Sequence, residues 1–136
     1  MKIQNRREFI VSTALLSSGL AASALIPENY KKNKQQVVHH VFFWLKNSAS
    51  KEDFNKLIDG LRTLKKIEIV RKIHIGIPAV TEFRPVIDNS YSASVILFFD
   101  DLAGQKTYQD HSIHQKFIAN CSLLWKKIIV YDSMEV

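Results

Sequence analysis

The chain has 136 residues, of which 46% are apolar and 24% charged, and its formal net charge is +6. This length suffices for one compact domain and is too short for two ordinary ones, and the composition excludes both a disordered polar chain and a polytopic membrane protein. A single cysteine, Cys121, excludes an internal disulfide framework and any multi-thiolate metal site.

The N-terminal segment resembles an export signal of the twin-arginine type. Arg6 and Arg7 precede an almost uncharged stretch at residues 11–26, which contains the small-x-small pattern of a cleavage site at residues 22–24. We expect residues 1–24 to be the signal and the mature protein to be periplasmic or otherwise extracytoplasmic. The alternative is an uncut anchor helix, although this stretch falls short of the roughly twenty apolar residues that span a bilayer.

A polar segment at residues 25–36 separates this signal from the rest of the chain. It shows no apolar periodicity and is predicted to be a flexible tether, followed by one folded domain at residues 37–136. Acidic residues alternate with the basic ones of the domain, a pattern typical of a solvated surface. Nucleic acid is therefore not an expected partner, and neither is a membrane once the signal has been removed.

The domain begins with a predicted strand at residues 37–46, where β-branched and aromatic residues follow one another. Strand alternation places the odd-numbered residues from His39 to Leu45 on one face and the even-numbered residues from His40 to Trp44 on the other. A helix follows at about residues 51–65, with Ser50 as its N-cap and apolar residues at helical spacing.

The middle of the domain is predicted to contain two further strands joined by a long loop. Alternation of apolar and polar residues indicates a strand at residues 67–76, and a heavily apolar run indicates another at residues 91–99. The loop at residues 77–91 contains two prolines and is longer than a hairpin needs. Such loops often cover a functional site.

The C-terminal third is predicted to be mostly helical before a last strand. Asp100 or Asp101 caps a helix that runs through Asp110. A break at residues 111–114, a helix at residues 113–125 and a strand at residues 127–134 follow.

This order predicts an α+β protomer of the ferredoxin-like βαββαβ type, with a four-stranded antiparallel sheet and helices on one face. The first strand is apolar on both sides, so the face without helices needs another cover. A second copy of the chain is the simplest cover for this face, because two sheets packed face to face bury their outer aromatic side chains. We therefore expect a homodimer built as a dimeric α/β barrel.

Five segments together resemble a known family. They are residues 38–46 (VHHVFFWLK), Ile75-Gly76 after the second predicted strand, Phe98-Phe99-Asp100-Asp101, Tyr108-x-x-His111-x-x-His114 and Val130-Tyr131-Asp132. The pattern is similar to the stress-responsive dimeric α/β-barrel (Dabb) family over about residues 37–134. Ser112 stands where the family usually has proline, which leaves the positions of both histidines unaffected.

The resemblance implies a dimeric barrel of ferredoxin-like protomers and a small-molecule pocket. Most members of the family are uncharacterised, some plant members are stress-associated, and one branch is a polyketide cyclase that performs an aldol-type ring closure. In that branch, residues matching Tyr108 and His114 carry the reaction. The histidine takes a proton from the carbon beside a carbonyl, and the tyrosine hydroxyl holds the developing enolate oxygen.

Other residues complete the expected site. Asp132 is expected to orient His114 by accepting its second N–H, as carboxylates do for catalytic imidazoles. The small apolar or enolisable ligand is expected in a pocket between the sheet and the helices, lined by His39, Val41, Phe43, Leu57, Leu61, Val95, Leu97 and His111.

The sequence leaves several functions open. The domain is either a binding module or an enzyme of the cyclase, isomerase or lyase type, in which His114, Tyr108 and Asp132 are catalytic. These three side chains could equally form a structural network, and His39 could be an ordinary core histidine. No cofactor or metal is predicted, and a metal- or haem-binding barrel is a further alternative because the two histidines at i and i+3 have imidazole and carboxylate groups nearby.

Overall fold

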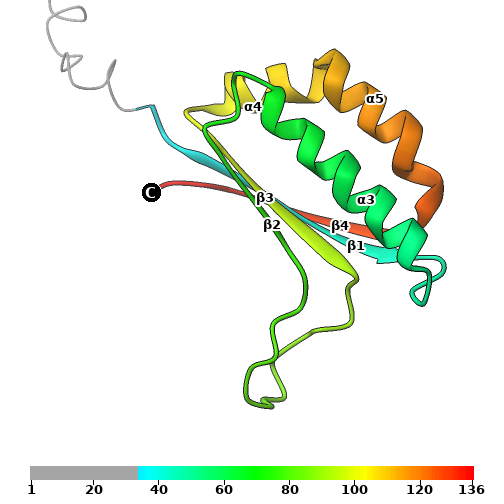
Figure 1. The fold of residues 1–136 in the computed structure, drawn as a ribbon. Helices are drawn as coiled ribbons and strands as arrows, with labels where there is room; N and C mark the ends of the chain where they lie inside the picture. Colours follow the sequence, from blue (N-terminus) through cyan, green and yellow to red (C-terminus); the bar gives the residue numbers. More distant parts are fainter. Residues whose placement is uncertain (1–33) are drawn as a thin grey trace, which may run out of the picture. The chain divides into compact units, whose positions relative to one another are not determined.

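The computed structural model describes residues 34–136, and one compact unit spans Gln35–Val136. The predicted signal and most of the predicted tether lie outside the described residues. The elements follow in the order β1 (Val37–Leu45), α3 (Lys51–Thr63), β2 (Lys72–Gly76), β3 (Ala93–Phe99), α4 (Leu102–Asp110), α5 (Ser112–Cys121) and β4 (Trp125–Met134), with short 3-10 turns at Leu64–Lys66 and Ser122–Leu124 (Figure 1).

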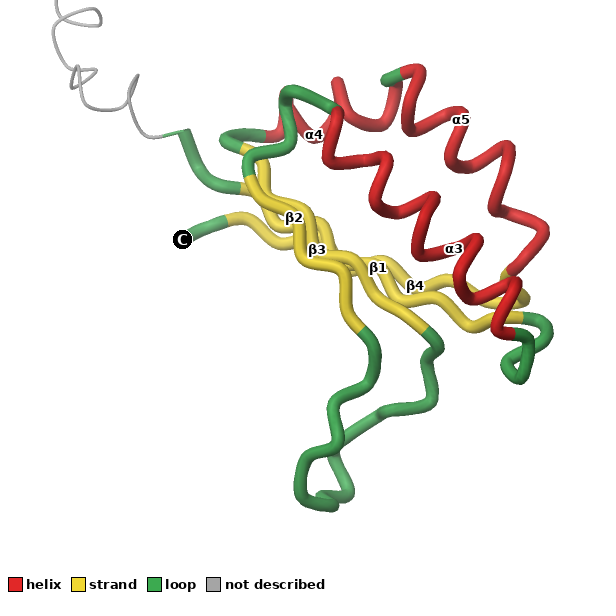
Figure 2. The backbone as a smooth tube through the Cα atoms, viewed as in Figure 1, coloured by secondary structure: helices red, strands yellow, loops and turns green. Residues whose placement is uncertain are grey.

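The strands form one antiparallel sheet in the order β2-β3-β1-β4. All three helices cover the same face of this sheet, as Figures 1 and 2 show. The ferredoxin-like α+β fold predicted from the sequence is therefore confirmed. Within residues 34–136, no helix is long and apolar enough to cross a membrane.

The predicted helix caps are present. The Ser50 hydroxyl accepts a hydrogen bond from the Asp53 amide at 3.1 Å and starts α3. The Asp101 carboxylate accepts from the Gly104 amide at 2.8 Å and starts α4. Each cap satisfies an amide that has no partner inside its own helix, which fixes where the helix begins.

Two predicted boundaries were wrong. The second strand begins at Lys72 instead of residue 67, because the amides of Ile67 and Val70 bond to carbonyls within tight turns instead of to a neighbouring strand. The last helix ends at Cys121, and a 3-10 turn leads into β4 at Trp125. Apolar alternation at residues 67–71 reflects burial of Ile67 under the helices, which a turn achieves as well as a strand.

The predicted alternation of β1 is confirmed. Its odd-numbered residues are buried on the helix-side face, within a core that β3 and α3 share. Its even-numbered residues lie on the opposite face, which no helix covers and which we call the open face. There Phe42 packs edge-on against Tyr91 with ring centroids 4.9 Å apart, and the Lys127 ammonium lies 4.5 Å above the Trp44 ring.

Candidate functional site

A histidine and a carboxylate meet across two neighbouring strands. His39 on β1 and Asp132 on β4 are directly opposite each other in the sheet, so both lie on the helix-side face. His39 Nδ1 is 2.5 Å from Asp132 Oδ1. Because an ionised carboxylate only accepts hydrogen bonds, His39 Nδ1 carries the proton of this bond, and in the neutral ring Nε2 has the lone pair.

This pairing corrects the role expected for Asp132. Asp132 was expected to accept from His114, whereas in the structure it is bonded to His39. The register of β1 and β4 determines the partner of Asp132, since it places Asp132 opposite His39, 93 positions away in the chain.

Tyr108 lies beside both histidines, in the last turn of α4. Its ring centroid is 5.8 Å from that of His39 and 4.5 Å from that of His114. The side chain is buried, and this burial raises the pKa of the Tyr108 phenol above its usual value. The hydroxyl therefore keeps its proton at neutral pH and can donate a hydrogen bond.

His114 stands in the first turn of α5 and is held by the backbone. Its Nδ1 donates to the carbonyl oxygen of Gln109 at 3.0 Å, so Nε2 carries the lone pair. Burial lowers the pKa of His114, the bond to Gln109 opposes that shift, and the charge of His39 adds to it. The imidazole is therefore neutral at pH 7 and has one basic nitrogen available.

His111 has a structural role next to this group. It ends α4 and begins α5, and its Nδ1 accepts a hydrogen bond from the Ile113 amide at 3.1 Å. The predicted break between the helices is thus a single residue. As a cap, His111 sets the start of the helix that positions His114, and only its Nε2 is left for a ligand.

The apolar residues predicted to line a pocket are core residues. None is more than 4% exposed, and all belong to the hydrophobic core: Val41, Phe43, Leu57, Leu61, Val95 and Leu97. They pack beneath the polar group and support it. Their contact with a ligand stays a prediction.

The polar group is open toward β4. The Asp132 side chain is 53% exposed although its partner His39 is buried. Ile128, Val130 and Met134 share this face of β4 and are also exposed, because the helices do not extend over the edge strand. A ligand can therefore approach Asp132 and His39 from the side of β4.

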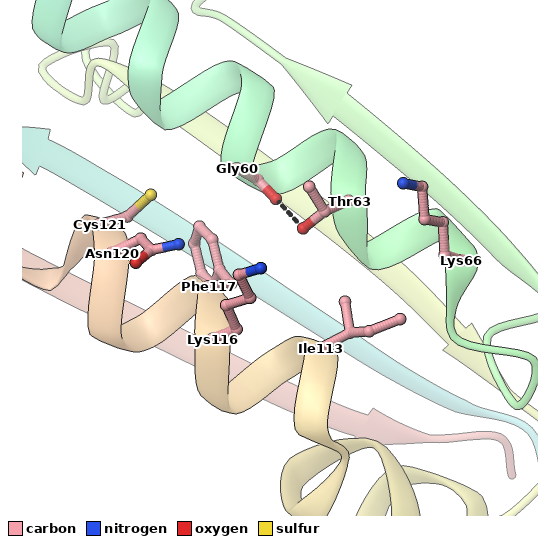
Figure 3. A pocket seen from close by; sticks show the side chains of 8 residues that line it. All are labelled: Gly60, Thr63, Lys66, Ile113, Lys116, Phe117, Asn120 and Cys121. Atoms are coloured by element: carbon pink, nitrogen blue, oxygen red, sulfur yellow. Dashed lines mark hydrogen bonds between the residues drawn. The ribbon is translucent and has the colours of Figure 1, made fainter.

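A separate cavity of about 260 Å³ lies between α3 and α5. Figure 3 shows the side chains that line it, which are Gly60, Thr63, Lys66, Ile113, Lys116, Phe117, Asn120 and Cys121. None of them belongs to the predicted site. A Cβ atom at Gly60 would lie 2.6 Å from Cys121 Sγ, so the glycine permits the close approach of the two helices. Burial raises the pKa of the Cys121 thiol, which disfavours the reactive thiolate.

The metal alternative finds no support in this part of the chain. Among residues 34–136, no three His, Cys, Asp or Glu side chains are arranged to hold a metal ion. The Asp132 carboxylate is bonded to His39, and His114 Nδ1 is bonded to a carbonyl oxygen.

Comparison with known families identifies the chain. Residues 37–135 match the model of the Dabb family, the stress responsive A/B barrel domain. The chain therefore belongs to this family, as its sequence pattern predicted. No protein with curated annotation matches it.

Solved structures of similar proteins show the same fold. A Dabb family protein with a ferredoxin-like fold from Mesorhizobium loti is 26% identical, with a TM-score of 0.61, over 75% of this chain and 98% of that one. A dimeric ferredoxin-like protein of unknown function from Thermobifida fusca is 16% identical, with a TM-score of 0.60, over 74% and 91%. A hydroxynitrile lyase from Passiflora edulis is 17% identical, with a TM-score of 0.61, over 76% and 95%.

Proposed function

We propose that this Dabb-family protein binds a small molecule with a carbonyl oxygen next to an acidic C–H or O–H group. The observation that carries the proposal is a set of three polar atoms on neighbouring side chains. Within residues 34–136, the Tyr108 hydroxyl and the Nε2 atoms of His39 and His114 have no hydrogen-bond partner. None of the three is a fully buried unpaired atom, since among the described residues only His40 Nε2 is. Each therefore reaches the accessible surface, so a ligand can pair with them.

The protonation states of these atoms define the chemistry of the ligand. The Tyr108 hydroxyl is a donor and suits an oxygen acceptor such as a carbonyl. In the neutral rings the two imidazole nitrogens are acceptors and suit a hydroxyl or a weakly acidic C–H. The surrounding core is apolar, so the remainder of the ligand is expected to be apolar as well.

Acetophenone, an enolisable ketone with one ring, is a suitable probe. Its titration should shift the imidazole signals of His39 and His114 in NMR spectra, and Tyr108→Phe should weaken binding about tenfold because one hydrogen bond is lost. Tyr131→Phe is the matched control, since it removes a hydroxyl from the open face. Equal binding by both variants, or unchanged histidine signals, contradicts the proposal.

Proton transfer is a second candidate function, favoured by the fixed state of His114. Its Nδ1–H is held by Gln109, so the neutral ring presents Nε2 as a general base, and Tyr108 can donate to the enolate oxygen that forms. In deuterated water the protein should then exchange the methyl protons of acetophenone. His114→Gln should slow this exchange about a hundredfold or more without loss of the fold. Binding without exchange identifies a binding module.

We propose that the protomer works as a homodimer joined through the open face. Aromatic and apolar residues cover this face, and a single protomer leaves them half-buried or, for the last, exposed: Phe42, Trp44, Ile96, Phe98, Ile129 and Tyr131. Similar structures from three bacteria are described as dimeric. Sedimentation of the wild type at micromolar concentration tests the proposal, and a stable monomer contradicts it.

We propose further that the protein is exported, with Arg6 and Arg7 as the recognition pair of a cleaved signal. The support is the sequence pattern of residues 1–24, which lie outside the described part of the chain. Replacing both arginines with lysine should leave the precursor in the cytoplasm. Mass spectrometry of the wild type should find an N-terminus near Leu25, whereas an intact Met1 on a membrane-bound form indicates the anchor.

A further inference from the structure

Residues 77–92, which we call the β2–β3 arm, extend away from the domain. Figures 1 and 2 show the arm on the side of the sheet opposite the helices, that is, on the side of the open face. The predicted site lies under the helices, so the arm does not cover the site of its own protomer. The length of this loop predicted a cover over a site, so the position of the arm requires another explanation.

The arm carries an unusual amount of exposed apolar surface. Its large apolar side chains protrude into solvent, with Val80 and Phe83 more than 90% exposed, and Ile77 and Val86 are exposed as well. Exposed apolar area costs about 25 cal/mol per Å² relative to burial. Contiguous apolar patches of this kind mark interaction surfaces.

The arm has a defined shape despite this exposure. The Ile87 amide bonds to the Arg84 carbonyl at 3.0 Å and closes a turn, and both the amide and the hydroxyl of Ser90 bond to the Asp88 carboxylate. A preformed arm loses little conformational entropy when it binds, so its apolar side chains are already presented to a partner.

The base of the arm is joined to the open face. The Trp44 indole donates to the Ser90 hydroxyl at 3.0 Å, and Tyr91 packs against Phe42 with ring centroids 4.9 Å apart. The arm and the open face therefore form one continuous surface with a corner between them. Whatever covers the open face must also meet the inner side of the arm.

We propose that the β2–β3 arm clasps the second subunit of the homodimer, with Val80, Phe83 and Val86 packed on the partner's surface. This inference rests on the homodimer proposed above and assigns a second contact to it. By two-fold symmetry each subunit receives one arm and gives one, so both apolar arms are buried in a single closed assembly.

The charges of the arm favour a protein partner over a membrane. Glu82 and Arg84 flank Phe83, so the tip carries no net positive charge, and Asp88 adds a negative charge behind it. Segments that bind anionic lipid surfaces are typically rich in lysine and arginine. A tip with one charge of each sign lacks this feature.

Photo-cross-linking locates the contact of the arm. A benzophenone amino acid at Phe83 should yield covalent dimers, and a mixture of isotope-labelled and unlabelled subunits should show that the linked peptides come from different chains. The same group at Lys116 on α5, on the helix side of the sheet, is the control and should yield no such dimer. Cross-links only within one subunit of a dimeric protein overturn the proposal.

A double variant tests the energetic contribution. Phe83→Ser with Val86→Ser should raise the dimer dissociation constant about tenfold or more, because two apolar side chains leave the interface. Thr81→Ser is the matched control on the same arm. Unchanged dimerisation of a folded double variant overturns the role of the arm, whereas a monomeric wild type overturns the homodimer itself. Arm-dependent sedimentation of the wild type with vesicles, without dimerisation, identifies a membrane contact and overturns both.

Discussion

His39 and His40 are neighbours in the chain and lie on opposite faces of the same strand. His39 is buried on the helix-side face, and its Nδ1 is bonded to Asp132. His40 faces the open side, where its Nε2 is buried without a hydrogen-bond partner among the described residues. The comparison shows that the helix-side face pairs its strand histidine within one protomer, whereas the open face leaves a buried nitrogen of its histidine unpaired.

The largest expected effect comes from a charge on the open face. Trp44→Asp replaces a ring that contacts Tyr91, Ser90 and Lys127 with a carboxylate. We expect the dimer to weaken at least about a hundredfold, because an unpaired charge is costly in an apolar interface. Sedimentation velocity measures this, with Lys116→Asp on the helix side as control. Equal dimerisation of both variants contradicts a dimer through the open face.

The two histidines should respond differently to the same substitution. His39→Phe removes the partner of Asp132 and should lower the free energy of unfolding by about 1–2 kcal/mol. His40→Phe removes a nitrogen that is unpaired within the protomer, so the fold should lose little stability. If the partner subunit bonds to His40 Nε2, dimerisation of this variant weakens. Chemical unfolding measures the stability of each variant, and sedimentation measures its dimerisation. If both variants lose the same free energy of unfolding, the proposed difference between the two faces is wrong.

Acid should destabilise both faces through different histidines. Burial lowers the pKa of His40, and the charges of His74 and His39 lower it further, while burial also lowers the pKa of His114. At these two positions the folded chain therefore binds fewer protons than the unfolded chain, for which the histidine pKa is 6.5. Above pH 6.5 both histidines are neutral in the folded and the unfolded chain, and the free energy of unfolding has its full value. As the pH falls from there through the lowered pKa values of the folded chain, the unfolded chain gains protons first and this free energy decreases.

This pH dependence can be divided between the faces. Unfolding of the wild type at about pH 7.5 and about pH 5.5 should show lower stability in acid. His40→Phe and His114→Phe should each reduce that difference, whereas His74→Gln should change it less because His74 acts only through its charge. If the loss of stability in acid is unchanged in a variant with both phenylalanine substitutions, His40 and His114 are not its cause.

Local patterns in the sequence predicted the fold well. Alternation along residues 37–45 gave the two faces of β1, and Ser50 and Asp101 gave the helix starts, because both signals depend on residues a few positions apart. The start of β2 was mispredicted for the same reason. Apolar alternation around Ile67 records burial, and burial alone does not distinguish a strand from a turn.

The site was only partly predictable, because its contacts depend on register and packing. Tyr108 and His114 come together within one helical break, so their spacing was informative. The pairing of Asp132 with His39 depends on how β1 and β4 are aligned, which no local pattern records. Core residues such as Leu57 and Leu97 also have the same apolar character whether they line a cavity or fill it.

The smallest effect on stability is expected from Asp132→Asn, and it tests whether the helix-side group is more than structural. The amide oxygen can still accept from His39 Nδ1, and Asp132 is half exposed, so the free energy of unfolding should change by less than about 1 kcal/mol. The partner of His39 Nδ1 nevertheless changes from a charged carboxylate to a neutral amide. At a fixed pH of about 7.5 the imidazole NMR signals of His39 should therefore shift, while those of His74 on the open face stay unchanged. A large loss of stability with unchanged His39 signals would instead show that Asp132 holds the end of β4 and does not act on the imidazole.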